Sequence, residues 1–329
     1  MVEVAPVAVL RRHFHHELLS IVDSGAMKGV ARARMVLLLL AALTAGVDAA
    51  QRPATGPTAN PADRFVTVNG LRIHYVDWGN PGAPPLLLIH GLDRVARTFD
   101  HLATHFTSRF HVIAVDMRGH GDSDWDPAGR YLVEDHAGDL EGLVRQLGLR
   151  DITVWGNSTG GRVAQVFAGM HPELVSRVIA EDVGPERPRQ IADSYSRRVA
   201  QEDLGWASEE ELLAQLRKGN AGTSDAVLVP YVRHGAKRRA DGRIVWKRDP
   251  KLVNGFVPTD LWRFVREIKA PTLYLLGGRS TIVPAATQDE LKKTLPKVQI
   301  VTMPGLGHYP SDEKPAEFLA IVDEFLRTS

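Results

Sequence analysis

Residues 151–161 read DITVWGNSTGG, an apolar run followed by a glycine-rich turn with a serine at its centre. A helix-compatible segment, residues 162–170, follows directly. A strand that turns sharply into a helix is the setting of the G-x-S-x-G motif, in which glycines permit close backbone contacts around an exposed serine. The stretch therefore predicts that Ser158 stands at the carboxyl edge of a sheet, placed to act as a nucleophile.

The chain on either side of this stretch alternates between apolar runs and helix-like segments. Continuous apolar runs are typical of strands buried on both faces of a parallel sheet, and such runs occupy residues 84–90, 111–117, 151–157 and 175–182. Two further strands are expected at residues 271–278 and 298–303. Segments with helical spacing of apolar residues lie between or after them, for example 133–147 and 315–326. This order predicts an α/β fold with a mostly parallel sheet flanked by helices.

Two further strands precede the first parallel one. Residues 64–68 and 71–78 alternate apolar and polar side chains on either side of Asn69-Gly70. An Asn-Gly pair between alternating segments is the strongest short signal for a β-hairpin. With these two antiparallel strands the expected sheet has eight strands.

Composition limits the function classes. The chain has 329 residues, 44% of them hydrophobic, and a formal net charge of +1, so we expect one large globular domain and no nucleic-acid partner. It contains no cysteine, which excludes disulfides, thiolate metal sites and a cysteine nucleophile. The composition does not indicate an oligomeric state.

The first 62 residues differ from the rest. From Met27, a basic stretch is followed by the apolar run 35–43 and by Val47-Asp48-Ala49, a small-residue cleavage site. This layout predicts a signal peptide at 27–50, after an upstream extension at 1–26 and before a Pro- and Thr-rich linker at 51–62. We therefore expect a periplasmic or secreted protein without a membrane span after processing; a disordered leader on a cytoplasmic protein is the alternative.

The strand-helix alternation stops between residues 185 and 260. This segment is charged and contains helical stretches such as 208–216. An insertion of this size at the carboxyl edge of a sheet would form a helical cap over the site. We therefore expect a core made of residues 63–184 and 261–329, interrupted by a cap at 185–260.

A serine hydroxyl needs a base within hydrogen-bond reach and donors for the oxyanion. Among 13 histidines we select His308, which lies in a glycine-rich loop after the last strand; His101, His105 and His171 are expected at the surface. His90-Gly91-Leu92 follows the first parallel strand, where the oxyanion loop belongs. The backbone amides of Leu92 and Thr159 are the expected donors.

These motifs, together with residues 116–123 (DMRGHGDS), resemble the α/β-hydrolase fold superfamily from residue 64 onward. Most members carry the catalytic acid after the penultimate strand, but Ser280 occupies that position here. Some branches place the acid after the strand that precedes the cap, where this chain has Glu181 and Asp182. The resemblance to the branch that includes 2-(acetamidomethylene)succinate hydrolase implies Asp182; Glu181 is the alternative, because lactone-cleaving relatives use a glutamate in this region.

The resemblance implies a capped serine hydrolase that acts by acyl transfer on a small carboxylic ester, lactone or amide-like substrate, with no metal and no organic cofactor. The alternatives are a C–C bond hydrolase, a perhydrolase and a non-hydrolytic ligand-binding member. His90, Arg94, Asn157 and Tyr309 are candidate substrate-binding residues. Arg94 and the nearby Arg97 could recognise a substrate carboxylate, although a surface charge is the simpler interpretation of each.

Overall fold

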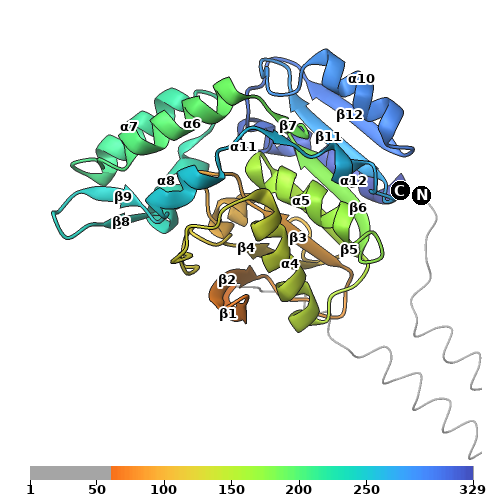
Figure 1. Ribbon diagram of the computed structural model, residues 1–329, viewed down its shortest axis with the longest axis horizontal. Coiled ribbons are helices and arrows are strands. Elements are labelled where there is room, and N and C mark those ends of the chain that lie inside the picture. Colours follow the sequence, from red (N-terminus) through yellow and green to blue (C-terminus); the bar gives the residue numbers. More distant parts are fainter. Residues whose placement is uncertain (1–60, 329) are drawn as a thin grey trace, which may run out of the picture. The chain divides into compact units, whose positions relative to one another are not determined.

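An eight-stranded sheet lies at the centre of the part of the chain that the structure, a computed structural model, describes (Figure 1). Its strand order is β1-β2-β4-β3-β5-β6-β11-β12, with β1 and β2 antiparallel to their neighbours and the other strands parallel. The bounds are β1 Ala62–Val68, β2 Leu71–Asp77, β3 Pro85–Ile89, β4 His111–Val115, β5 Ile152–Asn157, β6 Val175–Glu181, β11 Thr272–Gly277 and β12 Val298–Met303. The predicted mostly parallel eight-stranded sheet is confirmed, and Asn69 and Gly70 both have positive φ in the predicted hairpin turn.

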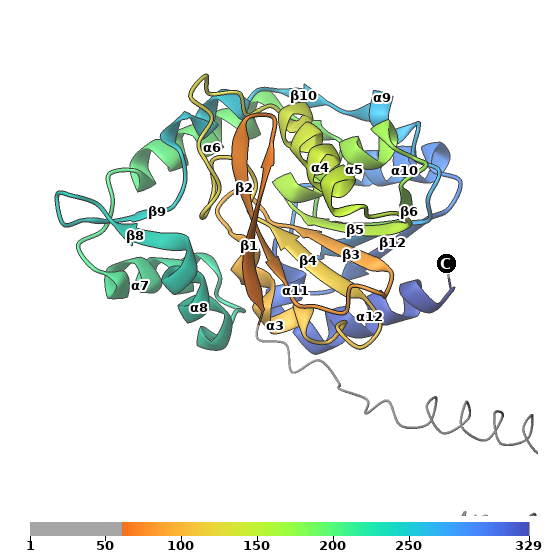
Figure 2. The same ribbon diagram turned by 90° about the horizontal axis from the view of Figure 1, so that it is seen from below.

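Helices cover both faces of this sheet, and each face has its own apolar core (Figure 2). One layer contains α4 (Val133–Leu147), α5 (Thr159–Met170), α9 (Trp262–Val265) and α10 (Ala285–Thr294). The other contains η1 (Ala96–Phe99), α3 (Asp100–Ala103) and α12 (Pro315–Thr328). Strands buried on both faces explain why their sequences are continuous apolar runs.

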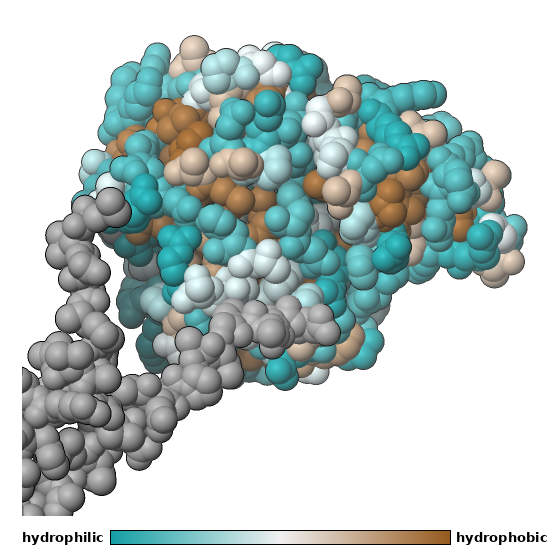
Figure 3. All heavy atoms as spheres, turned by 180° about the vertical axis from the view of Figure 1, so that it is seen from behind, coloured by the Kyte–Doolittle hydropathy of each residue, from teal (hydrophilic) through white to brown (hydrophobic). Residues whose placement is uncertain are grey.

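The structure describes residues 61–328. The expected upstream extension, signal peptide and nearly all of the linker therefore lie outside the described residues. Within them, no helix combines the length and the apolar composition that crossing a membrane requires. Hydrophilic and apolar side chains are interspersed on the face drawn in Figure 3.

Residues 186–260 form a separate layer of structure that does not join the main sheet. Its elements are β7 (Glu186–Arg187), α6 (Arg189–Glu202), α7 (Glu209–Gly219), α8 (Asp225–Gly235), β8 (Ala236–Arg238), β9 (Ile244–Trp246), η2 (Pro250–Gly255) and β10 (Thr259–Asp260). A small apolar cluster that includes Trp206, Tyr231 and Trp246 stabilises it. Val199 and Phe256 pack on Leu92, so this segment contacts the sheet domain beside the expected oxyanion loop.

The turn between β5 and α5 is so tight that two of its glycines have no room for a side chain. A Cβ added to Gly156 would lie 2.2 Å from the Gly160 carbonyl oxygen. A Cβ added to Gly160 would lie 2.2 Å from the Ile89 carbonyl oxygen and 2.5 Å from that of His90. These contacts are with backbone, which a side-chain rotation cannot relieve. The glycines thus allow α5 to begin directly against β3.

Gly160→Ala should therefore destabilise the protein. Overpacking against a fixed backbone costs about 3 kcal/mol, which corresponds to a melting temperature roughly 6–12 °C lower. The matched control is Gly219→Ala, because Gly219 has no heavy atom within 4 Å of the added Cβ. Equal melting temperatures for the two variants, measured by circular dichroism, would contradict this account of the turn.

Candidate active site

Ser158 lies at the turn from β5 into α5 in a backbone conformation that few L-residues adopt. Its φ is 52° and its ψ is −117°. The conformation is held by hydrogen bonds on both sides: Ser158 N–H donates to the Glu181 carbonyl oxygen (3.0 Å), and Gly161 N–H donates to the Ser158 carbonyl oxygen (3.0 Å). Strained positive-φ residues persist only where surrounding bonds hold them, and they concentrate at functional sites. The turn therefore has the geometry of a nucleophile elbow.

His308 comes from the loop between β12 and α11 (Pro310–Glu313). Its Nε2 lies 2.9 Å from Ser158 Oγ, and its Nδ1 lies 2.6 Å from Asp182 Oδ2. An ionised carboxylate only accepts hydrogen bonds, so the proton is on Nδ1, and Nε2 is free to accept from the serine hydroxyl. The three side chains form one continuous hydrogen-bonded chain.

Asp182 directly follows β6 and is 1% exposed. Besides His308, its carboxylate accepts hydrogen bonds from the Gly277 backbone N–H (3.0 Å) and the Ser280 hydroxyl (2.6 Å). Gly277 is the last residue of β11 and Ser280 lies in the loop that follows, at the position where the resemblance to the superfamily leads one to expect an acid. Ser280 therefore donates to the carboxylate oxygen that also lies against His308 Nδ1.

Glu181 points to the other side of β6, as alternation along a strand requires. Its carboxylate accepts from Ser311 N–H (3.0 Å) and from Trp155 Nε1–H (3.4 Å) and is fully buried. The structure thus brings Asp182, and not Glu181, to His308. Glu181 instead ties α11, the short helix that follows His308, to the sheet.

Glu181 should make stability depend on pH. Burial raises the pKa of its carboxyl to about 7, above the ordinary value near 4.5, so the folded state binds the proton more tightly than the unfolded state. The stability contributed by this proton is complete below about pH 4.5 and is lost as the pH rises through about 7, with a slope of up to about 1.4 kcal/mol per pH unit.

The measurement is the free energy of unfolding in urea from pH 5 to 8, for the wild type and for Glu181→Gln. The wild type should lose stability relative to the variant as the pH rises. The control is Glu324→Gln, since Glu324 is an exposed residue of α12. Parallel curves for the wild type and Glu181→Gln would rule out the titration of this carboxyl.

The two expected oxyanion donors belong to segments next to the serine. Thr159 is the first residue of α5, where backbone N–H groups are free of intrahelical partners. The loop that carries Leu92 passes close by: a Cβ on Gly91 would lie 3.3 Å from Ser158 Cβ. The Gly91 carbonyl oxygen, which belongs to the same peptide group as the Leu92 N–H, accepts from Arg94 N–H (3.1 Å) and lies 2.7 Å from His90 Nδ1, so this peptide is held in place. The loop is therefore placed to direct an amide toward a developing oxyanion.

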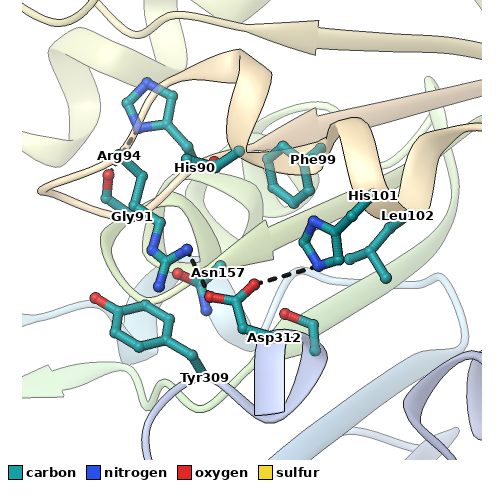
Figure 4. A pocket seen from close by; sticks show the side chains of 11 residues that line it. His90, Gly91, Arg94, Phe99, His101, Leu102, Asn157, Tyr309 and Asp312 are labelled. Carbon is teal, nitrogen blue, oxygen red and sulfur yellow. Dashed lines mark hydrogen bonds and ion pairs between the residues drawn. The ribbon is translucent and has the colours of Figure 1, made fainter. Parts of the chain in front are cut away.

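All four candidate substrate-binding residues line one small cavity of about 10 Å³: His90, Arg94, Asn157 and Tyr309 (Figure 4). Arg94 Nη1 forms an ion pair with Asp312 Oδ2 (2.6 Å), and its guanidinium lies 3.8 Å from the centre of the Tyr309 ring. Arg94 is only 6% exposed, so its interpretation as a surface charge is wrong. Its charge is neutralised inside the protein.

Two histidines contact the interior of the protein. His90 is fully buried, with Nδ1 2.7 Å from the Gly91 carbonyl oxygen and Nε2 accepting from Met117 N–H (3.0 Å). His101, expected at the surface, has Nε2 3.4 Å from Asp312 Oδ1 and lines the same cavity (Figure 4). No motif in the sequence indicated a role for Asp312, because its partners Arg94 and His101 precede it by more than 200 positions.

One group of described residues has the composition of a metal site. Ligand atoms of His74, Asp116 and Asp122 lie within 4.8 Å of one another. However, His74 Nδ1 lies 2.7 Å from Asp116 Oδ2, and its Nε2 lies 3.0 Å from Asp63 Oδ1. Both ring nitrogens are already used in hydrogen bonds, so the group is explained as a charged network that fixes β2.

Known proteins share this architecture. Residues 84–315 match a family model described as alpha/beta hydrolase fold. The chain is 30% identical over 271 residues to the sn-1-specific diacylglycerol lipase ABHD11 of Mus musculus, covering 75% of this chain and 82% of that protein. It is 29% identical over 271 residues to 2-(acetamidomethylene)succinate hydrolase of Mesorhizobium japonicum, covering 80% of this chain and 94% of that protein.

A solved structure is also similar to this chain. The crystal structure of E-2-(acetamidomethylene)succinate hydrolase superposes with a TM-score of 0.75 at 26% identity. The match covers 82% of this chain and 100% of that chain. The similarity thus extends over the sheet domain and residues 186–260 together.

Proposed function

Because the chain belongs to the α/β-hydrolase fold family, we propose that it is a serine hydrolase with Ser158, His308 and Asp182 as its catalytic triad. The observation that carries the proposal is the hydrogen-bonded chain from Ser158 Oγ through the His308 ring to Asp182. A serine, an imidazole and a carboxylate in this order have the arrangement that nucleophilic acyl transfer needs.

In the first half of the reaction, Ser158 Oγ attacks the substrate carbonyl and His308 Nε2 takes the hydroxyl proton. The backbone amides of Leu92 and Thr159 stabilise the oxyanion, and Asp182 stabilises the imidazolium. His308 then gives the proton to the leaving alcohol or amine, which departs and leaves the acyl-enzyme. Water, deprotonated by His308, attacks the acyl-enzyme and releases the acid.

The substrate class proposed is a small carboxylic ester, lactone or amide-like compound. Relatives named as a diacylglycerol lipase and as a 2-(acetamidomethylene)succinate hydrolase support ester and C–N cleavage respectively. A panel of p-nitrophenyl esters, lactones and N-acyl enamines would rank these bonds by kcat/KM. A C–C bond hydrolase is the second candidate, which Asn157 before the serine favours; ring-cleavage products belong in the same panel.

The decisive test is reaction with a fluorophosphonate probe, which labels activated serines. We expect stoichiometric labelling, with the modified peptide containing Ser158. A ligand-binding protein of this fold without an activated serine would not react. An unlabelled, folded wild-type protein would therefore refute the proposed function.

A further inference from the structure

The side chain of Asp93 links the expected oxyanion loop to the layer formed by residues 186–260. Asp93 follows Leu92, whose N–H is a proposed oxyanion donor. Its Oδ1 accepts a hydrogen bond from Arg248 Nη1 (2.8 Å), and its Oδ2 accepts one from Arg198 Nη2. Arg198 belongs to α6, and Arg248 lies between β9 and η2. One carboxylate of the loop is therefore held by two arginines that are far from it in the sequence.

Arg248 is almost completely buried, with 2% of its side chain exposed. Besides Asp93, its guanidinium pairs with Glu202 (3.0 Å) and Asp203 (3.3 Å) and donates to the Val199 carbonyl oxygen (3.3 Å). The last three residues lie at the C-terminal end of α6. A guanidinium presents its N–H donors in a fixed planar arrangement, so it can hold several groups at set positions. Arg248 thus fixes Asp93 and the end of α6 relative to one another.

The backbone around Arg248 is itself attached to the sheet domain. On either side of Arg248 it forms N–H to carbonyl hydrogen bonds of 2.7 and 2.8 Å with residues 119–121. His120, in the middle of that segment, has Nε2 2.8 Å from the Leu92 carbonyl oxygen. The segment that holds Arg248 in place therefore also contacts the oxyanion loop.

Apolar packing places α6 against the same loop. Val199 of α6 forms a buried apolar cluster with Leu92 and Phe256. Apolar packing is non-directional, whereas a hydrogen bond between a guanidinium and a carboxylate has a defined geometry. The two arginines on Asp93 therefore add an orientation that the packing of Leu92 does not provide.

The charges of this group determine which substitution is informative. Arg198 and Arg248 face three carboxylates, those of Asp93, Glu202 and Asp203. Burial opposes the negative charge of Asp93, but Arg198 and Arg248 hold the pKa of its carboxyl below the ordinary value. Asp93 is therefore ionised at neutral pH. Removing its charge would leave two arginines and two carboxylates, so no charge of the group would lack a counterion.

We propose that Asp93 is a positioning residue: through Arg248 and Arg198 it holds the loop where the Leu92 N–H meets the developing oxyanion. Donors aimed at an oxyanion act mainly in the transition state. Loss of these ion pairs should therefore lower kcat and leave KM nearly unchanged. This kinetic consequence rests on the proposed serine hydrolase function, whereas the attachment of the loop to Arg248 and Arg198 does not depend on catalysis.

The main test is Asp93→Asn, which keeps the size of the side chain. We expect kcat on an ester that the wild type cleaves to fall about 10- to 100-fold, because a displacement of about 1 Å at a catalytic group costs up to about 100-fold. KM should change by less than about threefold. Arg217→Met is the matched control, since Arg217 pairs with Asp225 elsewhere in residues 186–260. It should change neither constant.

Arg248→Lys separates the position of Asp93 from its charge. This variant keeps every charge of the group, but an ammonium lacks the planar fork that holds several carboxylates at once. A positioning role predicts a lower kcat for this variant too, with KM retained, and the prediction stands even if Asp93→Asn does not fold. If Asp93 acted only through the field of its charge on His308, Arg248→Lys would keep the wild-type kcat, and the inference would be wrong.

Hydrogen exchange measures the attachment of the loop without catalysis. Arg94 N–H donates to the Gly91 carbonyl oxygen (3.1 Å), which shares a peptide group with the Leu92 N–H. We expect the Arg94 amide to exchange at least about threefold faster in Asp93→Asn and Arg248→Lys, and at the wild-type rate in Arg217→Met. Unchanged exchange in both test variants would overturn the inference, as would a folded Asp93→Asn enzyme with the wild-type kcat. A wild type that the fluorophosphonate does not label would refute the proposed function alone, because the exchange rates would still show whether Asp93 holds the loop.

Discussion

Ser158→Ala is expected to lower kcat by about 10⁴- to 10⁶-fold and to abolish labelling by a fluorophosphonate. The reason is chemical: no other group in the proposed mechanism can form the acyl-enzyme, since His308 only takes the proton of Ser158 Oγ and Asp182 only stabilises the His308 imidazolium. The activity that remains would reflect binding and the oxyanion donors alone. The measurement is turnover of an ester from the panel that the wild type cleaves.

Ser176→Ala is the matched control, because Ser176 is a half-buried serine of β6 whose hydroxyl donates to the Asp151 carbonyl oxygen. It should keep both the activity and the label. Circular dichroism would check that Ser158→Ala folds. We expect it to fold, because the substitution removes a single hydroxyl group from a residue that is 7% exposed. An active, labelled Ser158→Ala variant would remove Ser158 from the mechanism.

The features that could be predicted from the sequence are those fixed by local pattern. Apolar runs predicted strands because a strand buried on both faces must be apolar throughout. The Asn69-Gly70 pair predicted the hairpin because both residues tolerate the positive φ that the turn requires. The glycines around Ser158 predicted the elbow because close backbone contacts exclude any side chain.

Long-range pairing could not be predicted in this way. Arg94 and Asp312 are adjacent only because the fold brings the loop after β3 against α11, and an isolated arginine in a sequence is more often exposed than buried. For the same reason nothing in the sequence distinguished Arg162 and Arg187 from other arginines. In the fold Arg162 and Arg187 are 4% and 2% exposed, and neither forms an ion pair with a carboxylate of residues 61–328, which only the positions of their neighbours reveal.

The choice between Glu181 and Asp182 depends partly on local sequence pattern and partly on long-range contacts. Because side chains alternate along a strand, only one of the two carboxylates can face the loop that carries His308. Alternation alone does not show which one, because the twist of the sheet and the residue at which β6 ends set the direction of each side chain. The resemblance to one branch of the family favoured Asp182. The structure adds the surroundings: three donors, His308, Gly277 and Ser280, converge on the Asp182 carboxylate.

Asp182→Asn is accordingly expected to lower kcat by about 10⁴-fold, whereas Glu181→Gln should have a far smaller effect. An amide in place of the carboxylate cannot stabilise the imidazolium, and it can donate to Nδ1 and so favour the wrong tautomer of His308. Steady-state kinetics on an ester cleaved by the wild type would measure both variants. If Glu181→Gln were the more damaging change, the role of the acid would pass to Glu181.

A second-site change tests the geometry behind this expectation. Ser280 Oγ lies 2.6 Å from the same carboxylate oxygen that bonds His308 Nδ1, so a carboxylate at position 280 would approach the imidazole from the position that most relatives use. Ser280→Asp in the Asp182→Asn background should therefore recover at least tenfold in kcat, which a purely structural role of Asp182 would not allow. Ser280→Ala in that background, which supplies no charge, should recover nothing. Recovery with both substitutions would show that the loss came from packing and not from the missing negative charge.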